Sequence, residues 1–175
     1  MNKLRNTVTL TTAAMLLALA AILGMLKIPV NQFIEIRFGS LPISVAGNLF
    51  GPVVAALIGG LADIVQFIVR PTGPYFPGFT ISGAVSGVIF GVFFFKKNLT
   101  WLRILVAETV HTIVVGIFLN TYWLMLLYGN KTYMAILIGR LPKEIVMIPI
   151  LTVLMYGIAK AVEKVRGRIQ APKEA

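Results

Sequence analysis

The sequence predicts an all-α membrane protein, a compact bundle of six transmembrane helices with N- and C-termini in the cytoplasm. Hydrophobic residues make up 58% of the 175 residues and charged residues only 13%, against about 45–50% and about 25% in soluble domains. The mean hydropathy is +0.89. Charged residues divide the chain into uncharged stretches of membrane-spanning length, and a chain of this size is expected to form one domain over residues 1–175.

Charged residues and prolines set the limits of the six expected spans. Arg5 and Lys27 enclose 21 uncharged residues, enough for one helix across a hydrocarbon core about 30 Å thick. The next uncharged stretch is interrupted by Pro42 and by Gly51-Pro52. Because proline either ends a helix or begins one, this stretch is predicted to hold one short and one long span. The spans are expected at about 8–26, 41–50, 52–69, 79–95, 101–127 and 142–165.

Lysine and arginine indicate the orientation, because they accumulate in cytoplasmic loops. With six spans and a cytoplasmic N-terminus, ten of the 16 Lys and Arg residues lie inside and six outside, whereas one fused span over residues 38–69 inverts the ratio. Six spans are therefore favoured. The outer cations are Lys27, Arg37, Arg70, Lys131, Arg140 and Lys143. The net charge of +10 is attributed to orientation and an anionic ligand, so no nucleic-acid partner is expected.

Polar residues align on three expected spans at a similar depth in the outer half of the bundle. The alignments are Asp63, Gln66, Phe67 and Arg70; Thr112, Gly116, Asn120 and Trp123; and Arg140, Lys143, Glu144 and Met147. Residues three and four apart share one helix face, and charges within spans usually face the bundle interior or a wet cavity. The pattern predicts a binding site. The alternative is that the acidic residues only pair with neighbouring cations at the membrane interface.

The segment between the third and fourth spans, residues 71–80, is rich in proline and glycine and carries three aromatic residues, among them Tyr75 and Phe76. Proline excludes a helix here, and irregular backbone at membrane depth is tolerated only where it is buried in protein or lines a cavity. The segment is predicted to form a lid over a ligand. The alternative is an ordinary turn whose aromatic residues lie in the interfacial belt.

Small residues predict close helix packing. The fourth span has glycine at positions 83, 87 and 91, and the third has Ala55 four residues before Gly59. Such spacing lets helix backbones approach closely in lipid, so these residues are expected to join the protein's own helices. The first span also has a small-residue face containing Ala14 and Ala18. This face is expected to contact either a partner protein or the bundle itself.

Enzyme chemistry finds little support. The chain has no cysteine and one histidine, His111, three residues after Glu108. Such a pair more often forms a buried hydrogen bond than a reactive site. A phosphate-binding loop of the ATPase type is missing from the sequence. Neither a cofactor nor a metal is expected, and ATP hydrolysis would require another subunit.

Several features together resemble the substrate-binding (S) component of an energy-coupling factor (ECF) vitamin transporter. They are the six short spans, Ala14 and Ala18 in the first span, Leu41-Pro42-Ile43 at the start of the second, and the segment Pro74-Tyr75-Phe76-Pro77-Gly78-Phe79. The similarity covers the whole chain and is greatest to the folate branch. It implies a vitamin site that opens to the outside of the cell membrane, and a transmembrane coupling subunit with two ATPase subunits as partners. Ala14 and Ala18 match the family's contact with the coupling subunit.

The predicted site residues suit folate, which has two carboxylates, a long flat aromatic body and a ring edge with adjacent N–H donors. Cations would hold the carboxylates, aromatic side chains would sandwich the rings, and Asp63 or Glu144 would accept from the ring edge with help from Gln66 and Asn120. The cations are Arg37, Arg70, Arg140 and Lys143, and the aromatic residues are Tyr75, Phe76, Tyr122 and Trp123.

Two other functions remain open at this point. One is the same role for another vitamin such as riboflavin. The other is a proton-coupled secondary carrier that uses Asp63, Glu108 or Glu144 as its relay. Its small size and the lack of an inverted repeat count against a carrier. A membrane scaffold without a ligand would leave the outer polar alignments unexplained.

Overall fold

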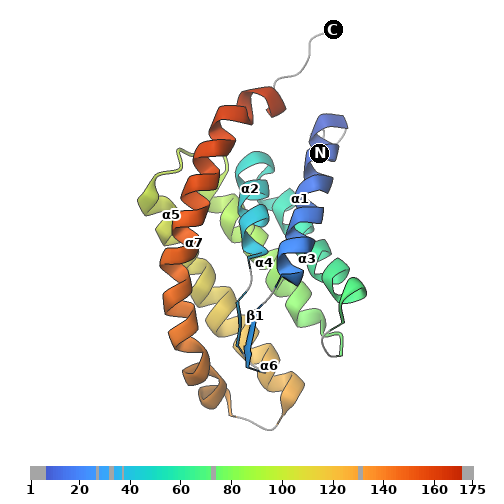
Figure 1. The fold of residues 1–175 in the computed structure, drawn as a ribbon, viewed down its shortest axis with the longest axis vertical. Coiled ribbons are helices and arrows are strands. Elements are labelled where there is room, and N and C mark those ends of the chain that lie inside the picture. The colour runs from blue at the N-terminus through green and yellow to red at the C-terminus, as the bar shows by residue number, and fades with distance from the viewer. Residues whose placement is uncertain are drawn as a thin grey trace.

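The computed structural model describes residues 7–26, 28–31, 34–36, 38–71, 74–129 and 132–170. Its helices lie side by side in a bundle, which confirms the predicted helical class (Figure 1). The start of α1 (Thr7–Met25) and the end of α7 (Tyr133–Gln170) lie at the same end of the bundle. The chain therefore passes along the bundle an even number of times. Which end faces the cytoplasm stays a prediction; the opposite end is called the outer end below.

Five of the helical segments are long and apolar enough to cross a membrane. The exception is α2 (Ser40–Phe50), an apolar helix of 11 residues that rises only about 16 Å. Gly51, with φ of +92°, separates it from α3 (Pro52–Val69), because this backbone conformation suits glycine. Both α3 and α4 (Pro77–Phe94) begin at a proline, where the missing N–H costs no helical hydrogen bond.

The fifth span is a single helix in three parts: α5 (Trp101–His111), the π-helical segment η2 (Thr112–Leu119) and α6 (Asn120–Tyr128). The backbone N–H of Asn120 donates to the carbonyl of Val115, a five-residue step in place of the usual four. This wider turn was not predicted. It rotates α6 relative to α5, so residues aligned by α-helical spacing do not all share one face.

The predicted start of the last span is wrong. It was placed at Pro142, but α7 begins at Tyr133 and contains both Pro142 and Pro149. Proline inside a helix removes one backbone hydrogen bond, yet it is tolerated in membrane helices because neighbouring groups can satisfy the freed carbonyl. The consequence is functional: Arg140 is helical and lies one turn before Glu144.

Two short strands join α1 to α2 at the outer end (Figure 1). Strands β1 (Ile28–Asn31) and β2 (Ile34–Ile36) pair antiparallel, with Ile28 opposite Ile36. This hairpin was not predicted from the sequence.

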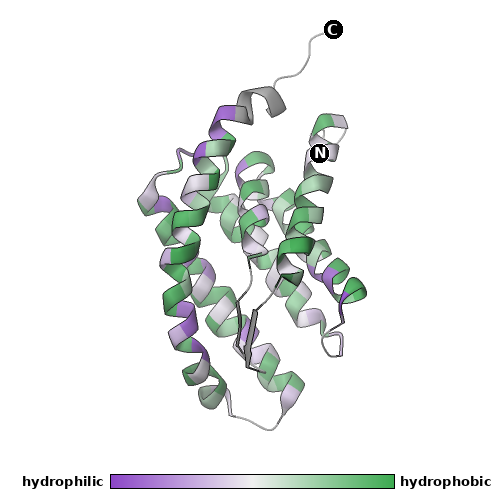
Figure 2. Cartoon of the chain, viewed as in Figure 1, coloured by the Kyte–Doolittle hydropathy of each residue, from purple (hydrophilic) through white to green (hydrophobic). Residues whose placement is uncertain are grey.

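The packed core occupies the end of the bundle that holds the termini. Buried side chains there include Phe90, Phe94, Ile104 and Met155. Figure 2 shows hydrophobic residues over most of the helices, with hydrophilic residues in the outer part of α7 and near the outer end of α3. Other hydrophilic residues lie toward the end of α7 near the C-terminus and on α5 (Figure 2).

Helices α3 and α4 approach so closely that their backbones are in contact. A Cβ atom on Gly87 would overlap the carbonyl of Ala55, and one on Gly59 would overlap the carbonyl of Gly83. The expectation that these small residues join the protein's own helices is therefore confirmed, and the structure identifies the pair as α3 and α4.

Replacing Gly87 with alanine is expected to lower the free energy of unfolding by roughly 1–3 kcal/mol, because the added methyl group must push two backbones apart. Thermal unfolding of the purified protein in detergent measures the change. Gly139→Ala is the matched control, since nothing lies within 4 Å of a Cβ there and alanine is the better helix former. Equal stability of the Gly87 and Gly139 variants would contradict the close approach.

Candidate functional site

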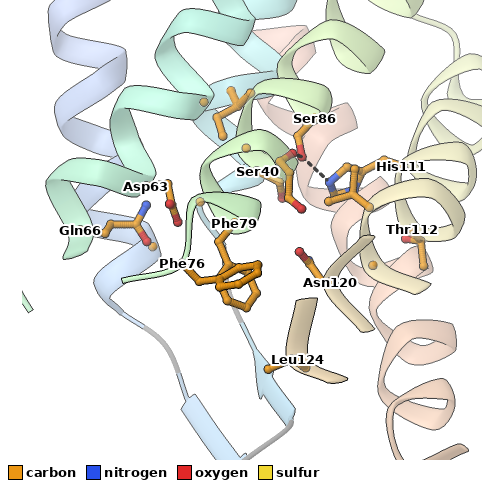
Figure 3. A pocket seen from close by; sticks show the side chains of 18 of the residues that line it. Ser40, Asp63, Gln66, Phe76, Phe79, Ser86, His111, Thr112, Asn120 and Leu124 are labelled. Atoms are coloured by element: carbon orange, nitrogen blue, oxygen red, sulfur yellow. Dashed lines mark hydrogen bonds between the residues drawn. The ribbon is translucent and has the colours of Figure 1, made fainter. Parts of the chain in front are cut away.

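A cavity of about 300 Å³ opens within the outer half of the bundle. Residues from α1, α2, α3, α4, α5, η2, α6 and α7 and from the segment before α4 line it. This volume lies in the range of small-molecule sites. Figure 3 shows Asp63 and Gln66 on one wall, with Thr112 and Asn120 on the wall across from them and Phe76 and Phe79 between.

Most of the predicted site residues come together here. The predicted residues that line the cavity are Asp63, Gln66, Arg70, Tyr75, Phe76, Asn120, Arg140 and Lys143. Glu144 lines it as well. Tyr122 and Trp123 are not among the described lining residues, and Arg37 lies outside the residues that the structure describes. That these residues bind a ligand stays a prediction.

On α7, two cations converge on one carboxylate oxygen. Arg140 Nη2 lies 3.1 Å and Lys143 Nζ 3.0 Å from Glu144 Oε1. Arg140 and Glu144 are 8% and 6% exposed, and their helical spacing of four residues brings them together. The group thus forms ion pairs and lines the cavity at the same time. Its formal charge is +1, which favours an anion in the cavity.

The segment before α4 is anchored by a chain of hydrogen bonds. Thr80 Oγ1 donates to Asp63 Oδ2 at 2.8 Å and lies 2.9 Å from the Tyr75 hydroxyl. The Tyr75 ring packs on Phe67, with ring centres 5.0 Å apart. At the end of α3, Arg70 Nη1 donates to the Met25 carbonyl at 3.3 Å, which ties this edge of the cavity to α1.

The aromatic residues form two layers. Phe76 and Phe79 line the cavity, and Trp123 packs behind Phe76 with ring centres 5.6 Å apart. Trp123 Nε1 donates to Ser82 Oγ at 3.1 Å. The sequence analysis aligned Trp123 with Asn120, but η2 rotates the helix and Leu124 lines the cavity instead.

Glu108 and His111 form the hydrogen-bonded pair that the sequence predicted, but they also line the cavity. His111 Nδ1 lies 3.4 Å from Glu108 Oε1, and Nε2 lies 3.1 Å from Ser86 Oγ. Figure 3 shows the contact between Ser86 and His111. The missed signal was spacing: Glu108 lies four residues before Thr112, on the face already assigned to the site. Glu108 is 1% exposed.

Four cavity-lining residues each carry a buried polar atom without a hydrogen-bond partner among the described residues. These atoms are Ser40 Oγ, Glu108 Oε2, Asn120 Oδ1 and Arg140 Nε. A buried polar group without a partner is costly, so such atoms usually have an explanation in function or in bound molecules. Their gathering around one cavity points to a polar ligand.

Ala14 and Ala18 lie away from the cavity on an exposed face of α1, whereas Ala13, Ala20 and Ala21 are buried against the bundle. The contact of Ala14 and Ala18 with a partner stays a prediction.

A model of the ECF transporter substrate-specific component family matches residues 8–159. The chain belongs to this family. The ECF family resemblance expected from the sequence is thereby confirmed. Together with the apolar helices, membership identifies a multi-pass membrane protein that serves as a subunit of a transporter.

Several members of this family resemble the chain over most of its length. The folate transporter FolT of Clostridium novyi is 39% identical over 134 residues, which are 77% of each chain. FolT of Streptococcus mutans is 30% identical over 72% of this chain and 71% of its own. A crystal structure of FolT bound with folic acid superposes with a TM-score of 0.82 at 30% identity, covering 89% of this chain and 95% of that one. A bacterial ECF transporter S component with 22% identity has a TM-score of 0.69 and shares the fold.

Proposed function

We propose that the protein binds folate in its outer cavity and takes it into the cell as the S component of an ECF transporter. Its partners are a transmembrane coupling subunit and two ATPase subunits, and the protein itself hydrolyses no ATP. The site faces the outside of the cell membrane. The relatives named above are folate transporters, and the distribution of charge in the cavity supports the same ligand.

The observation that carries the proposal is the change in charge from one end of the cavity to the other. Lining residues follow one face of the fifth span from Glu108 through Asn120 to Tyr128. Toward the outer end, Arg140 and Lys143 add a net positive charge, while the inner end holds Glu108. A long ligand with carboxylates at one end and N–H donors at the other fits this polarity.

Folate has this distribution of groups. We place its glutamate part near Arg140 and Lys143, where charge-assisted hydrogen bonds are strong. Its ring system lies between Phe76 and Phe79 and the opposite wall, which Thr112 and Asn120 line. Thiamine is itself a cation and has no anionic group for Arg140 and Lys143 to bind. Riboflavin has no carboxylate for them.

Folic acid is expected to quench the fluorescence of Trp123 strongly and saturably at one ligand per protein, because this indole packs directly behind Phe76. The chain has two tryptophans, and Trp101 packs on Tyr156 in the other half of the bundle. The Trp101→Phe variant isolates the signal of Trp123. The Trp123→Phe variant corrects for light that folic acid itself absorbs.

Titration of the purified protein with folic acid, riboflavin and thiamine tests the assignment. The proposal expects saturable binding of folic acid alone. Binding of riboflavin without binding of folic acid would assign the protein to another vitamin.

A further inference from the structure

Glu108 and His111 form a buried pair that lines the cavity. Their position there points to a role in ligand binding. We propose that Glu108 selects the ligand by accepting from the N–H donors on the ring edge of folate, and that His111 is the positioning residue that holds it. This inference rests on the proposed function. It assigns the acceptor to Glu108 in place of Asp63 or Glu144.

The hydrogen bonds around His111 fix its donor and acceptor roles. Ser86 Oγ donates to the Ser82 carbonyl at 2.8 Å, which uses its one hydrogen. Ser86 Oγ must therefore accept from His111 Nε2, 3.1 Å away. The imidazole is thereby held with Nε2–H toward α4 and Nδ1 toward Glu108, an assignment made from the hydrogen-bond network.

A single proton then lies between His111 Nδ1 and Glu108 Oε1. Either a charged imidazole donates it to a carboxylate, or a protonated carboxyl group donates it to a neutral imidazole. In both arrangements Glu108 Oε2 has only lone pairs to offer. This oxygen is buried and has no partner among the described residues. It is an acceptor whichever residue holds the proton.

The other two carboxylates among the described lining residues, those of Asp63 and Glu144, contact neighbouring side chains. Glu144 Oε1 accepts hydrogen bonds from both Arg140 and Lys143. Asp63 Oδ2 accepts from Thr80, which in turn contacts Tyr75. A ligand at either group would share the carboxylate with these partners, whereas Glu108 Oε2 is buried and has no partner among the described residues.

The face of the fifth span supplies the rest of the recognition. Asn120 lines the cavity further out than Glu108, and its Oδ1 atom is also buried without a partner in the described part of the chain. Between them lies Gly116, where a Cβ would be 3.0 Å from the Glu144 carboxylate, so Glu144 covers this part of the wall. A ring that lies between Phe76 and this wall can place its donor edge at Glu108.

The test compares folic acid with its 2-deamino analogue, which lacks one donor of the ring edge. Wild-type protein is expected to bind folic acid roughly 10–100-fold more tightly than the analogue. Glu108→Met fills a similar volume without an acceptor, so it should lose roughly 10–100-fold in affinity for folic acid and almost nothing for the analogue. Glu108→Gln should recover most of the loss, since its amide can donate to His111 and accept from the ligand.

Controls separate recognition from structure. Glu163→Ala, at an exposed position on α7, should change neither affinity, and melting temperatures verify that each variant folds. Equal losses for folic acid and the analogue in Glu108→Met would make Glu108 structural and overturn the inference, as would unchanged discrimination. Glu108→Gln that binds as weakly as Glu108→Met would exclude Oε2 as an acceptor. A wild-type protein that binds no folic acid would refute the proposed function, and this inference with it.

Discussion

Replacing Ala18 with tryptophan is expected to abolish ATP-dependent folate uptake while folic acid binding by the isolated protein stays unchanged. Ala14 and Ala18 lie one turn apart on an exposed face of α1, and small residues allow a partner helix to approach closely. A large indole there blocks the approach. Neither residue is among those that line the cavity in the described part of the chain, so the site is left intact.

Uptake by membranes that contain the coupling subunit and the ATPases measures this effect, and co-purification of the coupling subunit measures the contact itself. Val153→Trp, at an exposed position on α7, is the matched control and should transport normally. Normal uptake by Ala18→Trp would remove the role assigned to this face. Wild-type uptake that a protonophore stops while ATP is present would favour a proton-coupled carrier instead.

Arg140→Ala is expected to weaken folic acid binding by about 2–4 kcal/mol, because it removes one side of a buried charged contact with a ligand carboxylate. Glu144 keeps Lys143 as its partner at 3.0 Å, so the fold should survive. Equilibrium titration of the purified variant measures the change.

The amide of pteroic acid makes this experiment specific. It carries the ring system and the benzamide of folate but no carboxylate, so Arg140→Ala should barely alter its affinity. Lys164→Ala, at an exposed position near the other end of α7, controls for a general loss of positive charge. Equal weakening of folic acid and this amide by Arg140→Ala would show that Arg140 does not hold the glutamate part.

The sequence predicts much of this fold because membrane helices follow simple rules. Apolar length and prolines at helix starts correctly predicted most of the helices, and the small residues correctly predicted close packing within the bundle. The same rules failed at Pro142, which local propensity places at a helix start. Contacts from neighbouring helices decide whether such a proline is tolerated, and these are not visible in the sequence.

The candidate site was predicted in part for a similar reason. The structure places Arg140, Asp63 and Asn120 in the cavity lining. These residues could be selected from the sequence because charge and spacing within spans can be read there. Trp123 lies behind it because the π-helical turn of η2 changes the register, and no residue pattern announced that turn. Glu108 was left out of the predicted folate site because its pairing with His111 suggested a structural role. The pair is present in the structure. Only the position of the cavity shows that the other oxygen of the Glu108 carboxyl group could meet a ligand.

A structure of the purified protein with folic acid tests the central claim most directly. The account predicts one folic acid in the outer cavity, with its carboxylates at Arg140 and Lys143 and its ring edge at Glu108. A cavity that stays empty at saturating folic acid, or a ligand bound at another surface, would contradict it.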